Sequence, residues 1–192
     1  MGSCRSRQAG GSAITTYKSG KDTFMSNAMS PSLHDIMTIT SILNRYCQAL
    51  NQADWDRFAS VFAPDATWMT GGTGLPEQFI RSFQGRDEIV SSISKNVSKL
   101  EMVVQMNHAP VISVSGDNAR AVSTFHEILR ADTENGATLI GTFRDELVRS
   151  GDSWLILNRY LDFSFIDLVV PRGLVISESR KPLPDCSLST TH

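Results

Sequence analysis

The chain has 192 residues, of which 41% are hydrophobic and 20% charged, and its formal net charge is −2. This composition is typical of a globular chain with one core and excludes a wholly disordered protein. The slight negative charge argues against a nucleic-acid partner, because binding to phosphates requires clustered positive charge. No apolar run is long enough to span a bilayer, so no membrane span is expected.

The three cysteines, Cys4, Cys47 and Cys186, are odd in number. Their spacing fits neither a disulfide framework nor a zinc site, so we expect reduced thiols, a cytoplasmic location and no metal. The sequence has no G-x-G-x-x-G, Walker, H-E-x-x-H or G-x-S-x-G motif. Redox cofactors, nucleotides and catalytic zinc are therefore poorly supported, and we expect no cofactor.

Residues 1–31 are rich in Ser, Gly, Lys and Arg and show no hydrophobic periodicity. They are predicted to form a disordered tail. From Ser32 the pattern changes, because apolar residues recur every three or four positions as far as Leu50. This predicts a long amphipathic helix that is capped by Ser32 and ends near Ala53.

Short elements follow this helix. Asp54 is the predicted cap of a second, short helix that continues to Phe62 and is closed by Pro64. Two short strands are predicted at residues 66–70 and 79–84, on either side of a glycine-rich loop. A third helix is predicted at residues 86–97.

The remaining sequence has the alternation of β structure. Four long strands are predicted, at residues 101–115, 119–132, 137–150 and 153–165. The turn signals between them contain Gly116, Gly136 and Gly151. Consecutive hairpins predict a curved antiparallel sheet, for which the N-terminal helices are the only available cover. The result is an α+β domain at residues 32–170, with a C-terminal tail at residues 171–192 that can act as a lid.

Four segments of the sequence carry a recognisable pattern in a fixed order. They are RYCQALNQADWD at 45–56, FAPDA at 62–66, GRDEI at 85–89, and GTFRDELV at 141–148 followed by GDSW at 151–154. Together they resemble the SnoaL-like proteins of the NTF2-like superfamily over residues 32–165. The pattern is most similar to the branch of scytalone dehydratase and bile-acid dehydratase, which residues 106–110 (MNHAP) also resemble. The resemblance implies an NTF2-like cone, in which helices and a curved sheet enclose one pocket.

The dehydratase branch implies loss of water from a hydroxylated carbonyl compound without a cofactor. The superfamily also holds cyclases, isomerases, dioxygenase β subunits and proteins without activity, so the fold does not settle the function. Dehydration of this kind needs a base, a hydrogen-bond donor for the enolate oxygen and an acid for the leaving hydroxyl group.

Three residues are candidates for these roles. Tyr46 matches the helix-borne tyrosine of the family, and its place on the apolar helix face predicts a hydroxyl that points into the cone; a core tyrosine bonded to a carbonyl is the alternative. His108 is a candidate base, although a lone histidine is often structural. Glu127 has apolar neighbours on its strand and is a candidate buried carboxylate with a raised pKa; an exposed charge on the convex face is the alternative. His126 faces the other side, so only one of the two should line the cavity.

Two positions depart from the family pattern. Asn51 stands where the dehydratases carry an aspartate, and Gln105 stands where their strand histidine aligns. An amide can bind a ligand oxygen but cannot transfer protons like a carboxylate, so both are assigned to substrate binding. In a regular strand Gln105 and His108 face opposite sides, unless a bulge near Pro110 changes this.

A fourth catalytic candidate is Asp145, which can orient a histidine or form a structural pair with Arg159. Aromatic side chains are predicted to line a pocket for a flat or polycyclic ligand, with plain core packing as the alternative for each of them. They are Trp68, Phe79, Phe83, Phe125, Phe143 and Tyr160.

We therefore expect a cofactor-free dehydratase, isomerase or cyclase acting on a small hydrophobic hydroxy-carbonyl compound, such as a polyketide, terpenoid or steroid-like metabolite. The two amide positions favour isomerisation or cyclisation over dehydration. The alternatives are a small-molecule binding module without turnover and a protein-interaction scaffold, which would require an exposed apolar patch. A partly apolar convex face of the sheet also predicts a homo-oligomer, either a dimer or a trimer.

Overall fold

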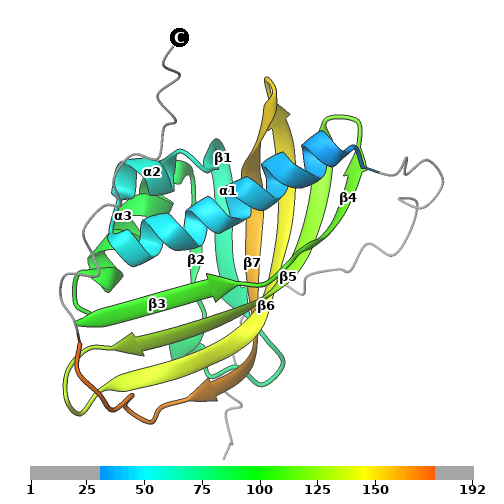
Figure 1. The fold of residues 1–192 in the computed structure, drawn as a ribbon. Helices are drawn as coiled ribbons and strands as arrows, with labels where there is room; N and C mark the ends of the chain where they lie inside the picture. The colour runs from blue at the N-terminus through cyan, green and yellow to red at the C-terminus, as the bar shows by residue number, and fades with distance from the viewer. Residues whose placement is uncertain (1–30, 176–192) are drawn as a thin grey trace, which may run out of the picture.

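A computed structural model describes residues 31–175 of the chain (Figure 1). The tail predicted at the N-terminus and most of the predicted C-terminal tail lie outside these residues. Within them, three helices lie on one side of a large curved sheet, as the α+β prediction required. No helix of the described residues combines the length and the apolar character that a membrane-spanning helix needs.

The longest helix, α1 (Leu33–Gln52), begins and ends close to the predicted positions. The Ser32 hydroxyl oxygen accepts a hydrogen bond from the Asp35 N–H at 3.0 Å and donates to the Asp35 carboxylate at 2.7 Å, which fixes the N-terminus. Ala53 adopts a left-handed conformation with φ of 55° and ends the helix. The apolar face of α1, which includes Tyr46, is buried against the sheet.

The second helix, α2 (Trp55–Ala59), is shorter than predicted, and α3 (Arg86–Val97) has the predicted bounds. Phe62 starts a strand instead of ending α2. Pro64 lies within that strand, at an irregularity between Phe62 and Thr67 in its pairing with a neighbour. Proline cannot donate to a ladder, so this position is compatible with a strand only where the pairing is interrupted. The strand predicted at residues 79–84 is likewise shorter, because a short 3-10 helix, Glu77–Phe79, comes first.

The sheet has seven strands among the described residues, in the order β2-β1-β7-β6-β5-β3, with β4 also paired to β5. They are β1 (Phe62–Gly71), β2 (Ser82–Gln84), β3 (Met102–Asn107), β4 (Val111–Ser115), β5 (Asn118–Arg130), β6 (Gly136–Ser150) and β7 (Ser153–Asp167). The β5–β6 and β6–β7 hairpins are antiparallel, as predicted.

The prediction of a fully antiparallel sheet was wrong for one pair of strands. β1 pairs with β7 in parallel, so the sheet is mixed. A hairpin can be predicted from the sequence because a turn motif lies between its two strands. β1 and β7 are separated by most of the domain, and no local motif marks such a pairing.

The strand predicted at residues 101–115 is two strands, β3 and β4, interrupted at residues 108–110. Asn107 pairs with Phe125 and Val111 with Val122, so β3–β4 carries one residue more than β5 across the break. The extra residue is the bulge that Pro110 suggested.

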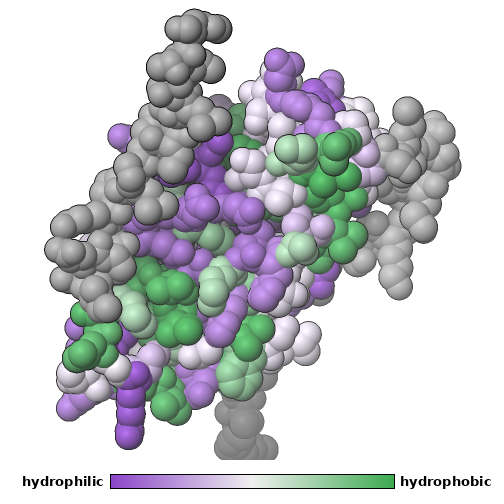
Figure 2. Space-filling view, viewed as in Figure 1, coloured by the Kyte–Doolittle hydropathy of each residue, from purple (hydrophilic) through white to green (hydrophobic). Residues whose placement is uncertain are grey.

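The two sides of the sheet differ in burial. The inner side faces the helices and carries the core, whereas Val104, Met106 and Val122 on the outer side remain exposed. Exposed apolar residues there agree with the reasoning behind the predicted oligomer, but the oligomeric state stays a prediction. Figure 2 shows the face that carries α1, where hydrophilic side chains cover the middle and hydrophobic ones gather near the N-terminal end of α1, at which Leu33 and Met37 are exposed.

Candidate functional site

Tyr46 lies at the centre of the interior and is fully buried. Its ring packs against those of Phe58, Phe62 and Phe143 at centroid distances of 4.9 to 5.9 Å. The indole N–H of Trp68 donates to the Tyr46 hydroxyl oxygen at 3.1 Å. Burial raises the pKa of Tyr46, so the phenol stays protonated and can donate its own hydrogen. Its hydroxyl points into the interior, as the helix pattern predicted.

A buried ion pair lies beneath Tyr46. Arg159 Nε and Nη2 donate to the two carboxylate oxygens of Asp145 at 2.7 and 2.9 Å, and both side chains are completely inaccessible. The guanidinium carbon also lies over two aromatic rings, 3.9 Å from the centroid of Tyr46 and 4.2 Å from that of Phe143. Burial alone lowers the pKa of Arg159, but the Asp145 carboxylate raises it to above its ordinary value. The arginine therefore stays charged.

The third nitrogen of this guanidinium, Arg159 Nη1, is buried without a hydrogen-bond partner among the described residues. Unsatisfied buried donors are rare and are typical of strained or functional sites. The sequence analysis treated Arg159 only as a structural partner of Asp145. The available signal was an arginine in the middle of a largely apolar strand segment, LILNRYLDF. Both carboxylate oxygens of Asp145 accept hydrogen bonds from Arg159. Of the two roles predicted for Asp145, this is the structural pair and not the orientation of a histidine.

A second polar group lies further along the inner face. Glu127 is half-buried on β5, on the same side of the strand as fully buried Phe125. The side-chain amide of Gln105 donates to Glu127 Oε2 at 2.8 Å. Burial raises the pKa of Glu127, and the hydrogen bond from Gln105 only partly offsets this. The question left open by the sequence is therefore answered, since Glu127 faces inward and His126 lies on the outer side of β5.

The two amide side chains that depart from the family pattern are bonded to the protein itself. Asn51 Nδ2 donates to the carbonyl oxygen of Gln105 at 2.9 Å, and Asn51 Oδ1 accepts from the Gln105 N–H at 2.7 Å. The Cys47 thiol donates to Gln105 Oε1 at 3.5 Å. Burial raises the pKa of Cys47 to about 12, so this group stays a thiol. The charge on Glu127 also raises the pKa of both Cys47 and Tyr46, which places these groups in one electrostatic environment.

Two predicted site residues do not belong to this interior. His108 is exposed, and its N–H donates to the Thr124 carbonyl oxygen in continuation of the β3 ladder. The bulge therefore follows His108 and does not turn it inward. Tyr160 lies between buried Arg159 and Leu161 on β7, so the alternation of the strand directs it to the outer side. The predictions that His108 and Tyr160 line the cavity are thus not supported by their positions.

The predicted pocket-lining aromatic side chains pack on each other. Trp68 and Phe83 are stacked with centroids 5.4 Å apart, and Phe125 and Phe143 are stacked at 4.5 Å. This is the core-packing alternative, which the sequence analysis left open for each of them. Phe79 is half-buried at the end of the short 3-10 helix.

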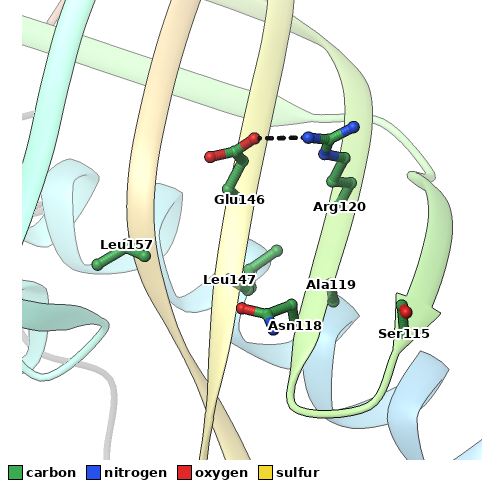
Figure 3. Close-up of a pocket in the computed structure, with 7 residues that line it drawn as sticks. All are labelled: Ser115, Asn118, Ala119, Arg120, Glu146, Leu147 and Leu157. Atoms are coloured by element: carbon green, nitrogen blue, oxygen red, sulfur yellow. Dashed lines mark ion pairs between the residues drawn. The ribbon is translucent and has the colours of Figure 1, made fainter. Parts of the chain in front are cut away.

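Two hollows on the molecular surface lie away from this interior. One, of about 220 Å³, is lined by residues of β4 to β7 that include the ion pair of Arg120 and Glu146 (Figure 3). The other, of about 570 Å³, runs along the exposed face of α1 and includes Met37 and Arg45. Neither hollow contains any of the predicted site residues.

The comparisons with known proteins agree with this architecture. The model of the SnoaL-like domain family matches residues 31–160, so the chain belongs to the SnoaL-like family. The sequence matches no curated protein. The predicted resemblance to this family is confirmed, as is the α+β, NTF2-like class of the fold.

Three solved structures are similar in fold. A candidate aromatic ring hydroxylase of Novosphingobium aromaticivorans is 18% identical with a TM-score of 0.64, over 72% of this chain and 96% of that one. A candidate scytalone dehydratase of the same organism is 18% identical with a TM-score of 0.60, over 72% and 89%. The hexachlorocyclohexane dehydrochlorinase LinA-type3 of Novosphingobium barchaimii is 12% identical with a TM-score of 0.60, over 72% and 92%. At these identities the likeness shows the fold alone.

Proposed function

We propose that this protein is a cofactor-free acid–base enzyme, a dehydratase, isomerase or cyclase, acting on a small hydrophobic carbonyl compound. The proposal depends mainly on the environment of the Glu127 carboxyl group. This carboxyl group is half-buried on the inner face, its pKa is raised by burial, and one of its oxygens, Oε1, has no bond within the described residues. A raised pKa brings a carboxyl group closer to the range in which it can both take and return a proton.

Glu127 would remove a proton from a carbon next to the carbonyl group, and the resulting enolate oxygen would be stabilised by hydrogen-bond donors of the interior. The protonated Glu127 would then return this proton, either to the leaving hydroxyl group, which departs as water, or to another carbon of the enolate in an isomerisation. Two donors have capacity left, the Tyr46 hydroxyl and Arg159 Nη1. Preorganised donors in a low-dielectric interior stabilise such charge more than water does. Asp145 would hold the guanidinium in place without transferring a proton, because Arg159 occupies both of its oxygens.

The likeness to relatives supports the proposal at the level of reaction class. The similar structures include a candidate scytalone dehydratase and a dehydrochlorinase, both of which are named for elimination reactions. The aromatic interior of this chain favours an apolar substrate, since only a few groups in it can make hydrogen bonds.

The test is mass spectrometry of the full chain incubated with a panel of β-hydroxy ketones and β,γ-unsaturated ketones. We expect loss of one water or formation of an isomer of unchanged mass with some panel members, and loss of this activity in Glu127→Gln and Tyr46→Phe. Glu134→Gln, which makes the same change at an exposed carboxylate, is the matched control and should leave the activity unchanged. Activity that survives Glu127→Gln but not His108→Ala would refute the assignment.

A binding module is the second candidate, because amides, which cannot transfer protons like a carboxylate or an imidazole, replace the family's aspartate and histidine and are hydrogen-bonded within the protein. Saturable binding of panel compounds, measured by calorimetry, without turnover of any of them would establish this function instead.

A further inference from the structure

Asn51 bonds to a single residue of the sheet through both the nitrogen and the oxygen of its side-chain amide. It lies in the last turn of α1 and makes both a donated and an accepted hydrogen bond with the backbone of Gln105, at 2.9 and 2.7 Å. β3 is the last strand in the order of the sheet. Asn51 therefore occupies the open edge of β3 as a neighbouring strand would, which also protects that edge from pairing with another chain.

The Asn51 bonds hold the backbone of Gln105 in the position from which its side chain reaches Glu127. Gln105 and Glu127 are directly opposite each other in the antiparallel β3–β5 ladder. Because both backbone groups of Gln105 are directed to Asn51, away from β5, this is a pair without ladder hydrogen bonds. Side chains approach more closely in such pairs than in hydrogen-bonded ones. The close approach brings Gln105 Nε2 to 2.8 Å from Glu127 Oε2.

Cys47 fixes the orientation of the Gln105 side chain. Its pKa of about 12 keeps the thiol protonated, so it donates to the amide oxygen of Gln105. The amide nitrogen is thereby directed to Glu127, where it can only donate. Glu127 Oε2 is occupied as a result, and Oε1 is left for a ligand.

We infer that Asn51 is a positioning residue for Glu127, which acts through the backbone and side chain of Gln105 and not by contact with substrate. The sequence assigned both Asn51 and Gln105 to substrate binding, but in the folded chain both amide groups are hydrogen-bonded within the protein. The relevance of this positioning to turnover rests on the proposed function. The coupling of Asn51 to Glu127 is a property of the folded chain and can be measured without a substrate.

The experiment is a carbon-13 NMR titration of the carboxyl group of Glu127 in Asn51→Ala, with Glu127→Gln used to assign the resonance. The hydrogen bond from Gln105 lowers the pKa of Glu127. We therefore expect an upward shift of the Glu127 titration in Asn51→Ala, similar to that in Gln105→Met. Asn44→Ala, at an exposed asparagine of the same helix, is the matched control and should not shift it.

The kinetic readout uses the panel ketone that the wild-type protein converts. With Asn51→Ala we expect kcat to fall roughly ten- to hundredfold, because a small misplacement of a reacting group has this effect, and KM to change less than about twofold. Should Asn51→Ala not fold, Asn51→Ser, which cannot make both backbone bonds, carries the same expectation. An unshifted Glu127 titration overturns the inference, and a rise in KM without that shift returns Asn51 to substrate binding. Absence of wild-type turnover refutes the proposed function, while the titration still decides the coupling.

Discussion

The pair of Arg159 and Asp145 provides the sharpest quantitative test of how the interior is stabilised. Both side chains are completely buried, and two hydrogen bonds of 2.7 and 2.9 Å join them. Unit charges about 4 Å apart attract each other by about 4 kcal/mol at an effective dielectric constant of about 20. Removal of one partner of such a buried pair costs about 3–5 kcal/mol, because the other charge is left unpaired.

We predict this cost for Asp145→Leu and for Arg159→Met, measured as the free energy of unfolding in urea. At about 2–4 °C per kcal/mol for a domain of this size, each variant should lose roughly 6–20 °C in Tm. The double variant should recover most of the loss, since replacing both charges by apolar groups removes their desolvation penalty. Arg144→Met is the control, because its pair with Asp162 is largely exposed and should contribute less than about 1 kcal/mol.

Two results would refute this reasoning. The first is that Asp145→Leu destabilises the protein by no more than Arg144→Met does. The buried guanidinium would then have found another partner or access to water. A double variant no more stable than the less stable single variant would mean that the loss comes from packing and not from an unpaired charge.

Three further predictions concern the same interior. Tyr46→Phe should destabilise the protein by about 1–3 kcal/mol in urea unfolding, because the buried indole N–H of Trp68 loses its acceptor; an unchanged urea midpoint would contradict the hydrogen bond. The pKa of Glu127 is raised on folding, so its contribution to stability is fully present below its unfolded pKa and is lost as the pH rises through the folded one. Glu127→Gln should therefore gain stability relative to the wild type as the pH rises from below the unfolded pKa of Glu127 to above the folded one, and a pH-independent difference in urea midpoints would argue against a raised pKa. Gly141→Ala should cost about 1–3 kcal/mol or prevent folding, because the added methyl group would lie 2.7 Å from the ring of Phe125; calorimetry showing an unchanged Tm would contradict that close approach.

Local signals in the sequence determined much of the fold. The Ser32 cap, the apolar face that contains Tyr46 and the turns at Gly136 and Gly151 depend on neighbours within a few residues, and the helix and hairpins that they predicted are present. The family pattern correctly predicted the SnoaL-like class. Strand alternation placed Glu127 and His126 on opposite faces of β5. It did not predict which of the two faces the helices cover.

The tertiary structure decided which contacts the side chains of the candidate site make. Whether Glu127 or His126 faces inward depends on which side of the sheet the helices cover, and the parallel pairing of β1 with β7 joins segments that no turn connects. The contacts of Asn51 and Arg159 depend on the tertiary structure for the same reason. A hydrogen bond depends on distances between atoms far apart in sequence, such as the 2.7 Å from Asn51 to the backbone of Gln105, and residue types alone do not fix such distances. The sequence therefore determined which polar and charged side chains the interior could contain, and packing decided which of their atoms are left without a hydrogen-bond partner.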